Sequence, residues 1–170
     1  MGAVAGLGIR PAGDDDVAEI HEIINDAAQA YRGIIPADRW HEPYMPLDEL
    51  QDQIADGIAF SGVEASGKLV GVMGIQDRGD VTLIRHAYVL SSKRNSGIGT
   101  RLLAHLEGLT AKPVLIGTWA AAHWAIRFYE KNGYRLLSRP DTGRLLRKYW
   151  TIPERQIETS VVLANSRWQG

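Results

Sequence analysis

Hydrophobic and polar positions along the chain follow two spacings, and together they predict a protein that contains both strands and helices. Runs rich in β-branched and aromatic residues, which suit a pleated surface, predict strands over 7–11, 58–65, 68–76, 81–90, 114–119, 134–137 and 157–164. Apolar residues three and four positions apart predict helices over 17–28, 48–56, 98–109 and 120–132. We therefore expect a mixed α/β (α+β) sheet of about seven strands flanked by about four helices.

The stretch over 83–133 organises the chain, because a strand there is followed by a basic, glycine-bearing loop and then by a helix. The loop reads Lys93-Arg94-Asn95-Ser96-Gly97-Ile98-Gly99-Thr100. The first turn of a helix has backbone N–H groups without partners and a partial positive charge. Gly97 and Gly99 have no Cβ, so an anion can approach the backbone closely, and Arg94 adds charge for a pyrophosphate-sized ligand. This order favours an anion-binding loop.

Composition and charge narrow the class of protein. A chain of 170 residues can bury a sizeable core, and we expect one domain over 1–170. The net charge of −1 argues against a nucleic-acid partner, and no apolar run is long enough to span a membrane. The absence of cysteine excludes disulfides, thiolate metal sites and a cysteine nucleophile. The default expectation for the location is cytoplasmic.

Four local patterns complete the outline of the chain. One of Asp14, Asp15 and Asp16 is expected to cap the first helix, which explains the triple aspartate better than a metal site does. The sequence Asp141-Thr142-Gly143 predicts a turn, and the residues over 145–152 are ambiguous. The C-terminal tail over 165–170 is polar and is expected to be loose.

A second glycine pattern imitates a nucleotide-binding loop. The stretch Gly62-Val63-Glu64-Ala65-Ser66-Gly67-Lys68 has the spacing of a P-loop. However, Leu69 stands where the magnesium-binding serine or threonine belongs, and a strand pattern follows instead of a helix. We therefore interpret Ser66-Gly67 as a hairpin turn between two strands, and ATP binding would be needed to revive the alternative.

Two motifs in order resemble the GNAT acetyltransferase superfamily. Arg94-Asn95-Ser96-Gly97-Ile98-Gly99 matches the Arg/Gln-x-x-Gly-x-Gly/Ala signature, whose loop binds the pyrophosphate of acetyl-CoA. Ala125-Ile126-Arg127-Phe128-Tyr129-Glu130-Lys131-Asn132-Gly133-Tyr134 is similar to the A-x-x-F/L-Y-E-x-x-G-F segment of the superfamily. The resemblance implies the GNAT fold with a mostly antiparallel sheet, and it is sharp over 83–134.

The resemblance also implies a reaction and a cofactor site. A GNAT enzyme moves an acetyl group from acetyl-CoA, used as a co-substrate without a metal, to a primary amine that attacks directly in a ternary complex. The implied cofactor-binding residues are the backbone around the kinked strand, the signature loop and one histidine of the second motif: Ala87, Tyr88, Val89, Arg94, Asn95, Ser96, Gly97, Ile98, Gly99, Thr100 and His123. N–H groups of that strand would stabilise the developing oxyanion.

Two side chains are candidates for proton transfer. Tyr129 matches the tyrosine that protonates the departing thiolate in many relatives; the alternative is a packing aromatic residue. Many relatives also use a glutamate as base on one of two neighbouring strands, but 83–90 and 114–119 contain no carboxylate. His86 is the candidate base there, against an equally strong reading as a histidine hydrogen-bonded within the sheet. Glu42, His41 and His123 are the fallbacks.

A further departure from the family pattern precedes Tyr129. Many relatives carry a CoA-contacting asparagine seven residues before the tyrosine, where this chain has Ala122. Either the contact is missing or His123 replaces it. Arg127 is explained better by an exposed helix position than by a phosphate contact.

The acceptor amine is expected to bind beside the irregular segment over 34–46. Aromatic and acidic side chains in and before it suit a small site for a cationic amine, namely Tyr31, Trp40, Glu42 and Tyr44. The resemblance thus predicts an N-acetyltransferase acting on a small-molecule or peptide amine, with a homodimer as a possible assembly. The alternative, suggested by the missing carboxylates, is a non-catalytic domain that binds or senses acyl-CoA.

Overall fold

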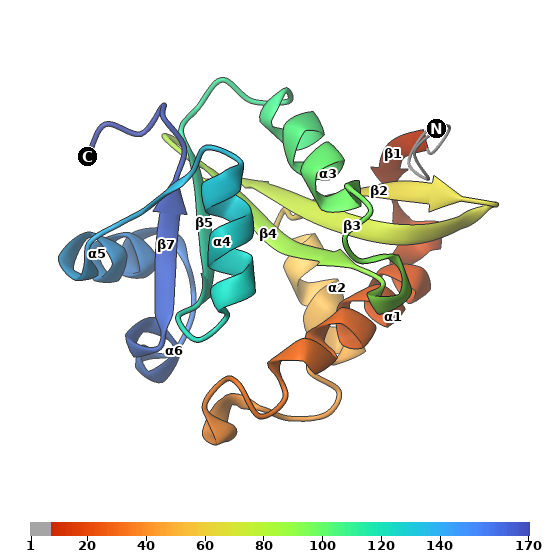
Figure 1. Cartoon of the computed structure of the whole chain (residues 1–170), viewed down its shortest axis with the longest axis horizontal. Helices are drawn as coiled ribbons and strands as arrows, with labels where there is room; N and C mark the ends of the chain where they lie inside the picture. Colours follow the sequence, from red (N-terminus) through yellow and green to blue (C-terminus); the bar gives the residue numbers. More distant parts are fainter. Residues whose placement is uncertain (1–7) are drawn as a thin grey trace. The chain divides into compact units, whose positions relative to one another are not determined.

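The computed structural model describes residues 8–170, which form seven strands and, within that range, six α-helices (Figure 1). The strands are β1 (Gly8–Ala12), β2 (Ala59–Ala65), β3 (Lys68–Asp77), β4 (Thr82–Val89), β5 (Val114–Trp119), β6 (Arg135–Leu136) and β7 (Ser160–Ala164). The α-helices are α1 (Val17–Ala28), α2 (Leu47–Ala55), α3 (Ile98–Glu107), α4 (His123–Lys131), α5 (Arg139–Tyr149) and α6 (Glu154–Glu158).

The strand order confirms the predicted fold class. The sheet is open and runs β1-β2-β3-β4-β5-β7-β6, and the pairs β1–β2, β2–β3, β5–β7 and β6–β7 are antiparallel. The predicted strands and helices all occur, with shifted boundaries, although Leu7 lies outside the described residues. The helix count of about four was too low, because α5 and α6 were not expected.

The chain divides into two compact units, which we describe separately. Unit 1 contains 8–30, 41–77 and 84–111, and unit 2 contains 31–40, 78–83 and 112–170. Strand β4 therefore begins in unit 2 and continues in unit 1. No helix within the described residues is long and apolar enough to cross a membrane.

The core of unit 1 lies between the sheet and helices α1 and α2. Its buried members come from both helices, strands β2 and β3 and the segments beside them, namely Ile20, Ile23, Ile24, Met45, Leu50, Ile58, Phe60, Leu69 and Val72. Each such side chain contributes about 1.5–3 kcal/mol when it leaves water completely. The helical spacing of the apolar residues of α1 explains why this helix buries one face.

Helix α3 packs on the sheet of unit 1 at a glycine. A Cβ added to Gly71 of β3 would lie 2.7 Å from Cγ2 of Ile98 and 3.5 Å from Cδ1 of Leu102. A β-bulge precedes this contact, because Val63 pairs with Gly71 while Glu64 pairs with Leu69, which skips Val70. Leu69 packs in the core with α1, whereas Gly71 contacts α3.

Ser66 and Gly67 form the predicted hairpin between β2 and β3. Both have positive φ, +53° and +80°, as a tight hairpin turn requires. Strand β3 follows directly, so the Gly62–Lys68 pattern lies in a hairpin rather than before a helix.

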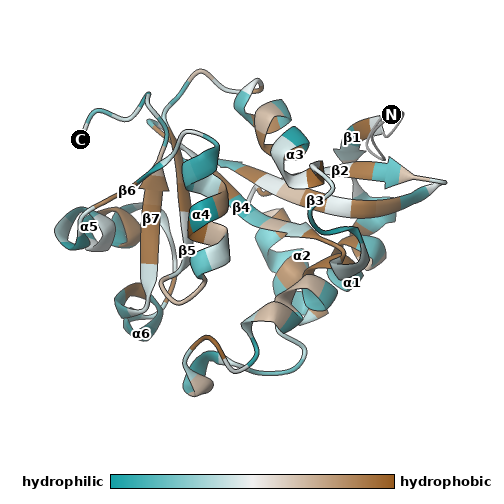
Figure 2. Ribbon diagram, viewed as in Figure 1, coloured by the Kyte–Doolittle hydropathy of each residue, from teal (hydrophilic) through white to brown (hydrophobic). Residues whose placement is uncertain are grey.

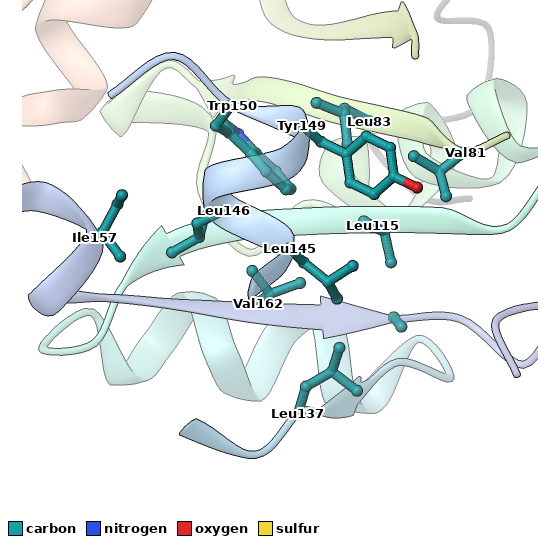
Figure 3. Close-up of a cluster of buried hydrophobic side chains, with 11 residues drawn as sticks. Val81, Leu83, Leu115, Leu137, Leu145, Leu146, Tyr149, Trp150, Ile157 and Val162 are labelled. Atoms are coloured by element: carbon teal, nitrogen blue, oxygen red, sulfur yellow. The ribbon is translucent and has the colours of Figure 1, made fainter. Parts of the chain in front are cut away.

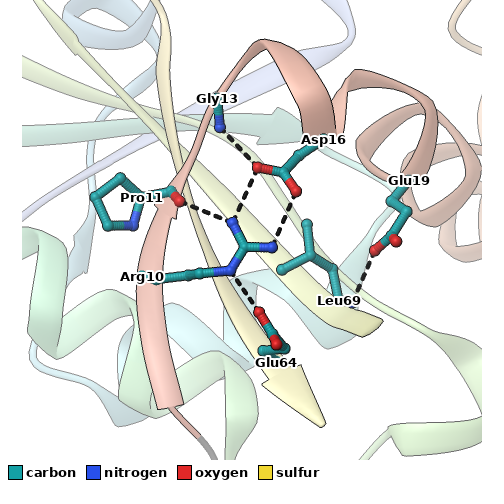
Figure 4. Close-up of polar contacts among 7 residues, drawn as sticks. All are labelled: Arg10, Pro11, Gly13, Asp16, Glu19, Glu64 and Leu69. Carbon is teal, nitrogen blue, oxygen red and sulfur yellow. Dashed lines mark hydrogen bonds and ion pairs between the residues drawn. The ribbon is translucent and has the colours of Figure 1, made fainter. Parts of the chain in front are cut away.

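The triple aspartate begins the first helical segment in a way that differs from the expected cap. Asp14–Asp16 form a 3-10 turn, and the Asp16 carboxylate accepts a hydrogen bond from the Gly13 N–H at 2.9 Å. The same carboxylate pairs with the Arg10 guanidinium, which also contacts Glu64 (Figure 4). Asp16 is the N-cap residue of α1 but makes no side-chain cap to it.

Unit 2 has its own core around α5 and β7 (Figure 3). The residues come from six segments of that unit, namely Val81, Leu83, Leu115, Leu137, Leu145, Leu146, Tyr149, Trp150, Ile157, Val162 and Ala164. Figure 2 shows β7 as a largely hydrophobic strand, consistent with its place between β5 and β6. Burial on both faces explains why this strand lacks a polar alternation.

Helix α5 corrects the predicted turn over 141–143 and settles the ambiguous residues that follow. Ser138 caps the helix by accepting a hydrogen bond from the Asp141 N–H at 3.2 Å, and Pro140 occupies the first turn. Leu145, Leu146 and Tyr149 then pack into the core. The strand expected over 157–164 is likewise divided into α6 and a shorter β7.

Residues Asn165 and Trp168 of the C-terminal tail make hydrogen bonds to unit 2. Asn165 is buried, and its Oδ1 accepts from the Val114 N–H at 3.1 Å. The Trp168 carbonyl accepts from Arg135 at 3.0 Å, and the Arg135 guanidinium also lies over the Trp168 ring. These contacts connect the chain end to strands β5 and β6 of unit 2.

Candidate functional site

The signature loop is largely exposed, and the segment just before it is bonded to α1 at Ser91. The Asp26 carboxylate accepts from the Ser91 backbone N–H at 2.8 Å and from the Ser91 hydroxyl at 3.1 Å. Arg94 is exposed, and its guanidinium makes a long contact of 3.5 Å with the Ala27 carbonyl. Most of the arginine side chain thus remains available to a ligand.

The start of helix α3 has the geometry that an anion requires. Gly97 is the N-cap, has φ +83° and provides no side-chain cap. The first hydrogen bond of the helix runs from the Arg101 N–H to the Gly97 carbonyl at 3.1 Å, so the N–H groups of 98–100 have no acceptor within the helix. Gly97 is exposed, while Ile98 is buried and anchors the turn.

Strand β4 is irregular at His86, which the sequence did not reveal, and we call this position the β4 bulge because a left-handed residue inside a strand is typical of β-bulges. His86 has φ +56°, in the left-handed region, within an otherwise extended strand. The neighbouring strand gives room for this irregularity, because a Cβ added to Gly74 would lie 2.9 Å from the Arg85 carbonyl oxygen. A bulge of this kind re-aims the backbone groups that follow it, here those of Ala87, Tyr88 and Val89.

The His86 side chain stacks with two aromatic rings and is bonded to helix α2. Its ring stacks with Phe60 at 6.2 Å and with Tyr88 at 6.4 Å between centroids. Its Nε2–H donates to Oε1 of Gln53, and Nε2 of Gln53 faces Oε1 of Glu49 at 3.4 Å. Because a glutamine oxygen can only accept, this bond places the histidine proton on Nε2.

The surroundings of His86 favour its neutral form. Burial, and secondarily the positive charge of Arg85, lower the pKa of His86 to about 3. Arg85 itself donates to Oε1 of Gln76 at 3.0 Å, and Gln76 donates to the Asp56 carboxylate at 3.2 Å. A histidine with so low a pKa is a weak base for an ammonium substrate.

Tyr129 lies in unit 2, buried on helix α4. It packs edge-on against Phe128 at 5.2 Å and Tyr134 at 6.0 Å between ring centroids. Burial, together with the nearby Tyr31, raises the pKa of the Tyr129 phenol well above its usual range. The phenol therefore keeps its proton near neutral pH and is suited to donate a hydrogen bond.

The residues expected around the acceptor fall into both units. In unit 2, Tyr31 is half-buried and stacks with Trp124 at 5.9 Å, and 39% of Trp124 is exposed. Trp40 is half-buried in the same unit. In unit 1, Tyr44 packs against the apolar core and stacks with His41 at 6.4 Å, while Glu42 is exposed.

The remaining candidates lie at or near the start of α4. His123 is its first residue and is exposed, so it is free to contact a ligand, and Arg127 is exposed on the same helix. Ala122, at the position of the family asparagine, is completely buried. No group of His, Asp and Glu side chains in the described part of the chain is arranged to hold a metal ion.

Three residues near these sites were not predicted from sequence. Gln53 and Gly74 both lie beside the β4 bulge, and Trp124 lies beside Tyr31. A glycine inside an apolar strand is a known sign of a bulge or a close backbone approach, so Gly74 carried a usable signal. Gln53 carried none, because an amide on a polar helix face is ordinary.

Comparison with known proteins tests the resemblance to the GNAT superfamily. The profile of the acetyltransferase (GNAT) domain matches residues 56–136 of the chain, whereas comparison with curated protein sequences gives no match. The predicted resemblance to the GNAT superfamily is thereby confirmed, and the matched segment contains the β4 bulge, the signature loop and Tyr129.

Solved structures with the same fold include acetyltransferases at low sequence identity. PaiA N-acetyltransferase from Thermoplasma acidophilum, in complex with coenzyme A, has a TM-score of 0.71 and 18% identity, covering 94% of this chain and 98% of that one. Escherichia coli ribosomal-protein-S18-alanine N-acetyltransferase has a TM-score of 0.67 and 15% identity, covering 96% of each chain. Neisseria gonorrhoeae N-acetylglutamate synthase, complexed with coenzyme A and N-acetyl-glutamate, has a TM-score of 0.65 and 20% identity, covering 97% of this chain and 36% of that one.

Proposed function

We propose that this protein transfers an acetyl group from acetyl-CoA to the primary amine of a small molecule or peptide, by direct attack in a ternary complex. The observation that carries the proposal is the exposed start of α3, where Gly97 is left-handed and the first-turn N–H groups have no cap. Such a site binds a pyrophosphate through backbone donors and the helix dipole. Arg94 is placed in the same loop and adds a charge-assisted contact.

The reaction needs three kinds of assistance from the chain. The amine nitrogen bonds to the acetyl carbon, the carbon–sulfur bond breaks, and the thiolate takes up a proton. N–H groups of 87–89 after the β4 bulge are proposed to stabilise the charge on the acetyl oxygen. Tyr129 is proposed to donate the proton to sulfur, supported by a buried phenol that stays protonated.

The base is proposed to be water or a group other than His86. The low pKa of His86 leaves this imidazole neutral but weakly basic, and β4 and β5 contain no carboxylate. A substrate amine that reaches the site already deprotonated needs no strong base. Activity should then rise with pH toward the pKa of the substrate amine rather than that of a histidine.

The acceptor is proposed to lie against the aromatic pair Tyr31 and Trp124. These rings stack at 5.9 Å, Trp124 is partly exposed, and Tyr31 is near enough to influence the Tyr129 phenol. Aromatic faces attract ammonium groups. A cationic amine is therefore the preferred class of acceptor, and His123 is proposed as a further contact to the cofactor.

The second candidate function is a domain that binds acyl-CoA without turnover. It is favoured by one observation, the lack of a carboxylate on β4 or β5 combined with the low basicity of His86. Such a protein would use the same loop and would bind CoA through the same N–H groups.

A thiol-release assay with a library of primary amines, run beside calorimetric titration of CoA, separates the two functions. We expect turnover with at least one cationic amine, and a rate that falls in Tyr129→Phe with little change in CoA affinity. Tight CoA binding with no turnover for any amine would support the sensor. No binding of CoA at all, in a protein whose fold is intact, would overturn both.

A further inference from the structure

The bulge at His86 is a strained feature that contacts from a side chain and from a neighbouring strand hold in place. A left-handed φ of +56° in a strand is uncommon for any residue with a side chain, although histidine tolerates it better than most. Such a conformation persists only where the surroundings over-determine it, and it is often found at functional sites. The supports of His86 therefore indicate what the bulge is for.

The first support is the His86 side chain. The ring stacks with Phe60 and with Tyr88, and Nε2–H donates to Gln53 of helix α2. Gln53 is oriented in turn by Glu49, one helical turn earlier. The chain of hydrogen bonds fixes both the tautomer and the ring position, so the side chain holds residue 86 to α2.

The second support is the backbone of the neighbouring strand. Gly74 of β3 has no Cβ, and a Cβ added there would lie 2.9 Å from the Arg85 carbonyl oxygen and 2.7 Å from Cγ2 of Ile58. Any other residue at position 74 would push on the peptide that enters the bulge. Arg85 is also bonded through Gln76 to Asp56, just after α2.

We propose that His86 is a positioning residue, which acts with Gln53 and Gly74 to hold the β4 bulge so that the N–H groups of 87–89 point at the acyl thioester. This inference rests on the proposed function and deepens it, because it gives the histidine a role that needs no proton transfer. Both side chains of the pair Gln53–His86 act through the backbone and do not touch the reacting atoms.

Gln53→Ala is the central variant, because Gln53 lies half-buried on a helix face and its loss leaves the core intact. Gln51→Ala, at an exposed position of the same helix, is its matched control. His86→Asn keeps a residue that tolerates the left-handed region, whereas His86→Ala removes the anchor. The double variant Gln53→Ala/His86→Ala completes a double-mutant cycle.

Two measurements are compared across these variants. Amide chemical shifts of 87–89 in the unliganded protein report the bulge without any need for turnover. The second measurement is the pH profile of kcat and of kcat/KM for acetyl transfer. We expect Gln53→Ala and His86→Ala each to shift those amide signals and to lower kcat by about 10- to 100-fold at every pH, since small misplacements of reacting groups cost this much.

The expected pattern has three further parts. The double variant is no slower than the worse single variant, His86→Asn recovers part of the rate, and Gln51→Ala behaves as wild type. Unchanged amide signals of 87–89 in Gln53→Ala would overturn the proposal. So would additive losses, or a loss confined to the His86 variants with an altered acidic limb of the profile, which would make His86 a base. Absence of turnover in the wild type would reject the acetyltransferase function alone, because the amide signals still test the bulge.

Discussion

His86 and Tyr129 are two titratable residues packed against aromatic rings, one in each unit of the molecule. Burial shifts their pKa values in opposite directions, downward for the histidine and upward for the tyrosine, and both remain neutral at physiological pH. Both shifts weaken full proton transfer, because the raised pKa makes the phenol a weaker acid and a pKa of about 3 makes the imidazole a weak base. The protonated phenol can still donate a hydrogen bond to a departing sulfur atom, whereas the imidazole has no comparable use as a base.

The partners of the two side chains reinforce this difference. The Nε2–H of His86 donates to Gln53, so the ring links strand β4 to helix α2. Tyr129 is held by ring contacts with Phe128 and Tyr134, which position the phenol through packing. We therefore propose different roles for two similarly packed side chains, hydrogen-bond donation for Tyr129 and support of the backbone for His86.

The largest expected effect is that of Tyr129→Phe. Removing the hydroxyl should lower kcat by about 100-fold, as for the loss of a general acid, and leave the melting temperature nearly unchanged. Tyr149→Phe is the matched control, because the Tyr149 hydroxyl donates to Asp80 in the same unit and takes no proposed part in the reaction. Steady-state kinetics measure both, and equal losses in the two variants would break the contrast between Tyr129 and a packing tyrosine.

The next effect is a pH dependence of stability that His86 contributes. The unfolded chain protonates this histidine near pH 6.5, whereas the folded protein does so only near pH 3. The unfolded state therefore binds the extra proton in that window, and stability falls as the pH drops through it. Between pH 6.5 and 5 the loss is at most about 2 kcal/mol.

Urea unfolding at pH 7, 6 and 5 measures this loss, and His86→Asn should reduce it. Gln51→Ala, which changes no titratable group, should retain the wild-type dependence on pH. If His86→Asn and the wild type lose stability equally, the imidazole is already accessible to protons in the folded state, and the contrast with Tyr129 would need revision.

A smaller effect is expected for Gly97→Ala, which should change the affinity for CoA more than the rate of the chemical step. Gly97→Ala places a Cβ on a residue with φ +83° at the start of α3. The strain and the added methyl group should weaken CoA binding by about tenfold, while kcat at saturation changes little. Gly67→Ala has nearly the same φ, +80°, but sits in a hairpin with open space around the added Cβ. Titration calorimetry should show CoA affinity unchanged in that control.

The smallest effect concerns the fastening of the signature loop to α1. Asp26→Ala removes both hydrogen bonds to Ser91, so the loop must be ordered by the ligand. We expect CoA affinity to fall about threefold, the size of one net hydrogen bond. Glu22→Ala, exposed on the same helix, is the control. A threefold loss in kcat instead would indicate that the loop also affects the bulge.

Much of the fold was predictable because it depends on local patterns. The apolar stripes of α1 and α3, the hairpin at Gly67 and the loop before α3 all follow from spacing and turn chemistry. Helix α5 was missed because Gly143 and Asp141 suggested a turn, although Ser138 and Pro140 form a helix start. Packing of Leu145 and Leu146 outweighed the low helix propensity of glycine.

The candidate site was predictable only in part, for a physical reason. The loop, Tyr129 and the lack of strand carboxylates are visible in the sequence itself. The bulge at His86 depends on a glutamine 33 positions earlier and on the backbone of β3, and such tertiary contacts have no local signature. A strand pattern therefore located His86 correctly but could not predict its backbone conformation.

The contact between Gly71 and Ile98 has a consequence for anyone who redesigns this protein. The missing side chain of Gly71 sets how closely helix α3 packs on the sheet of unit 1, since a Cβ there would lie 2.7 Å from Cγ2 of Ile98. A mutagenesis library can vary many of the residues that are proposed to face the phosphates, provided that Gly71 is kept constant. Replacing Gly71 would move helix α3 away from the sheet, and a resulting change in ligand preference would then be wrongly attributed to the loop.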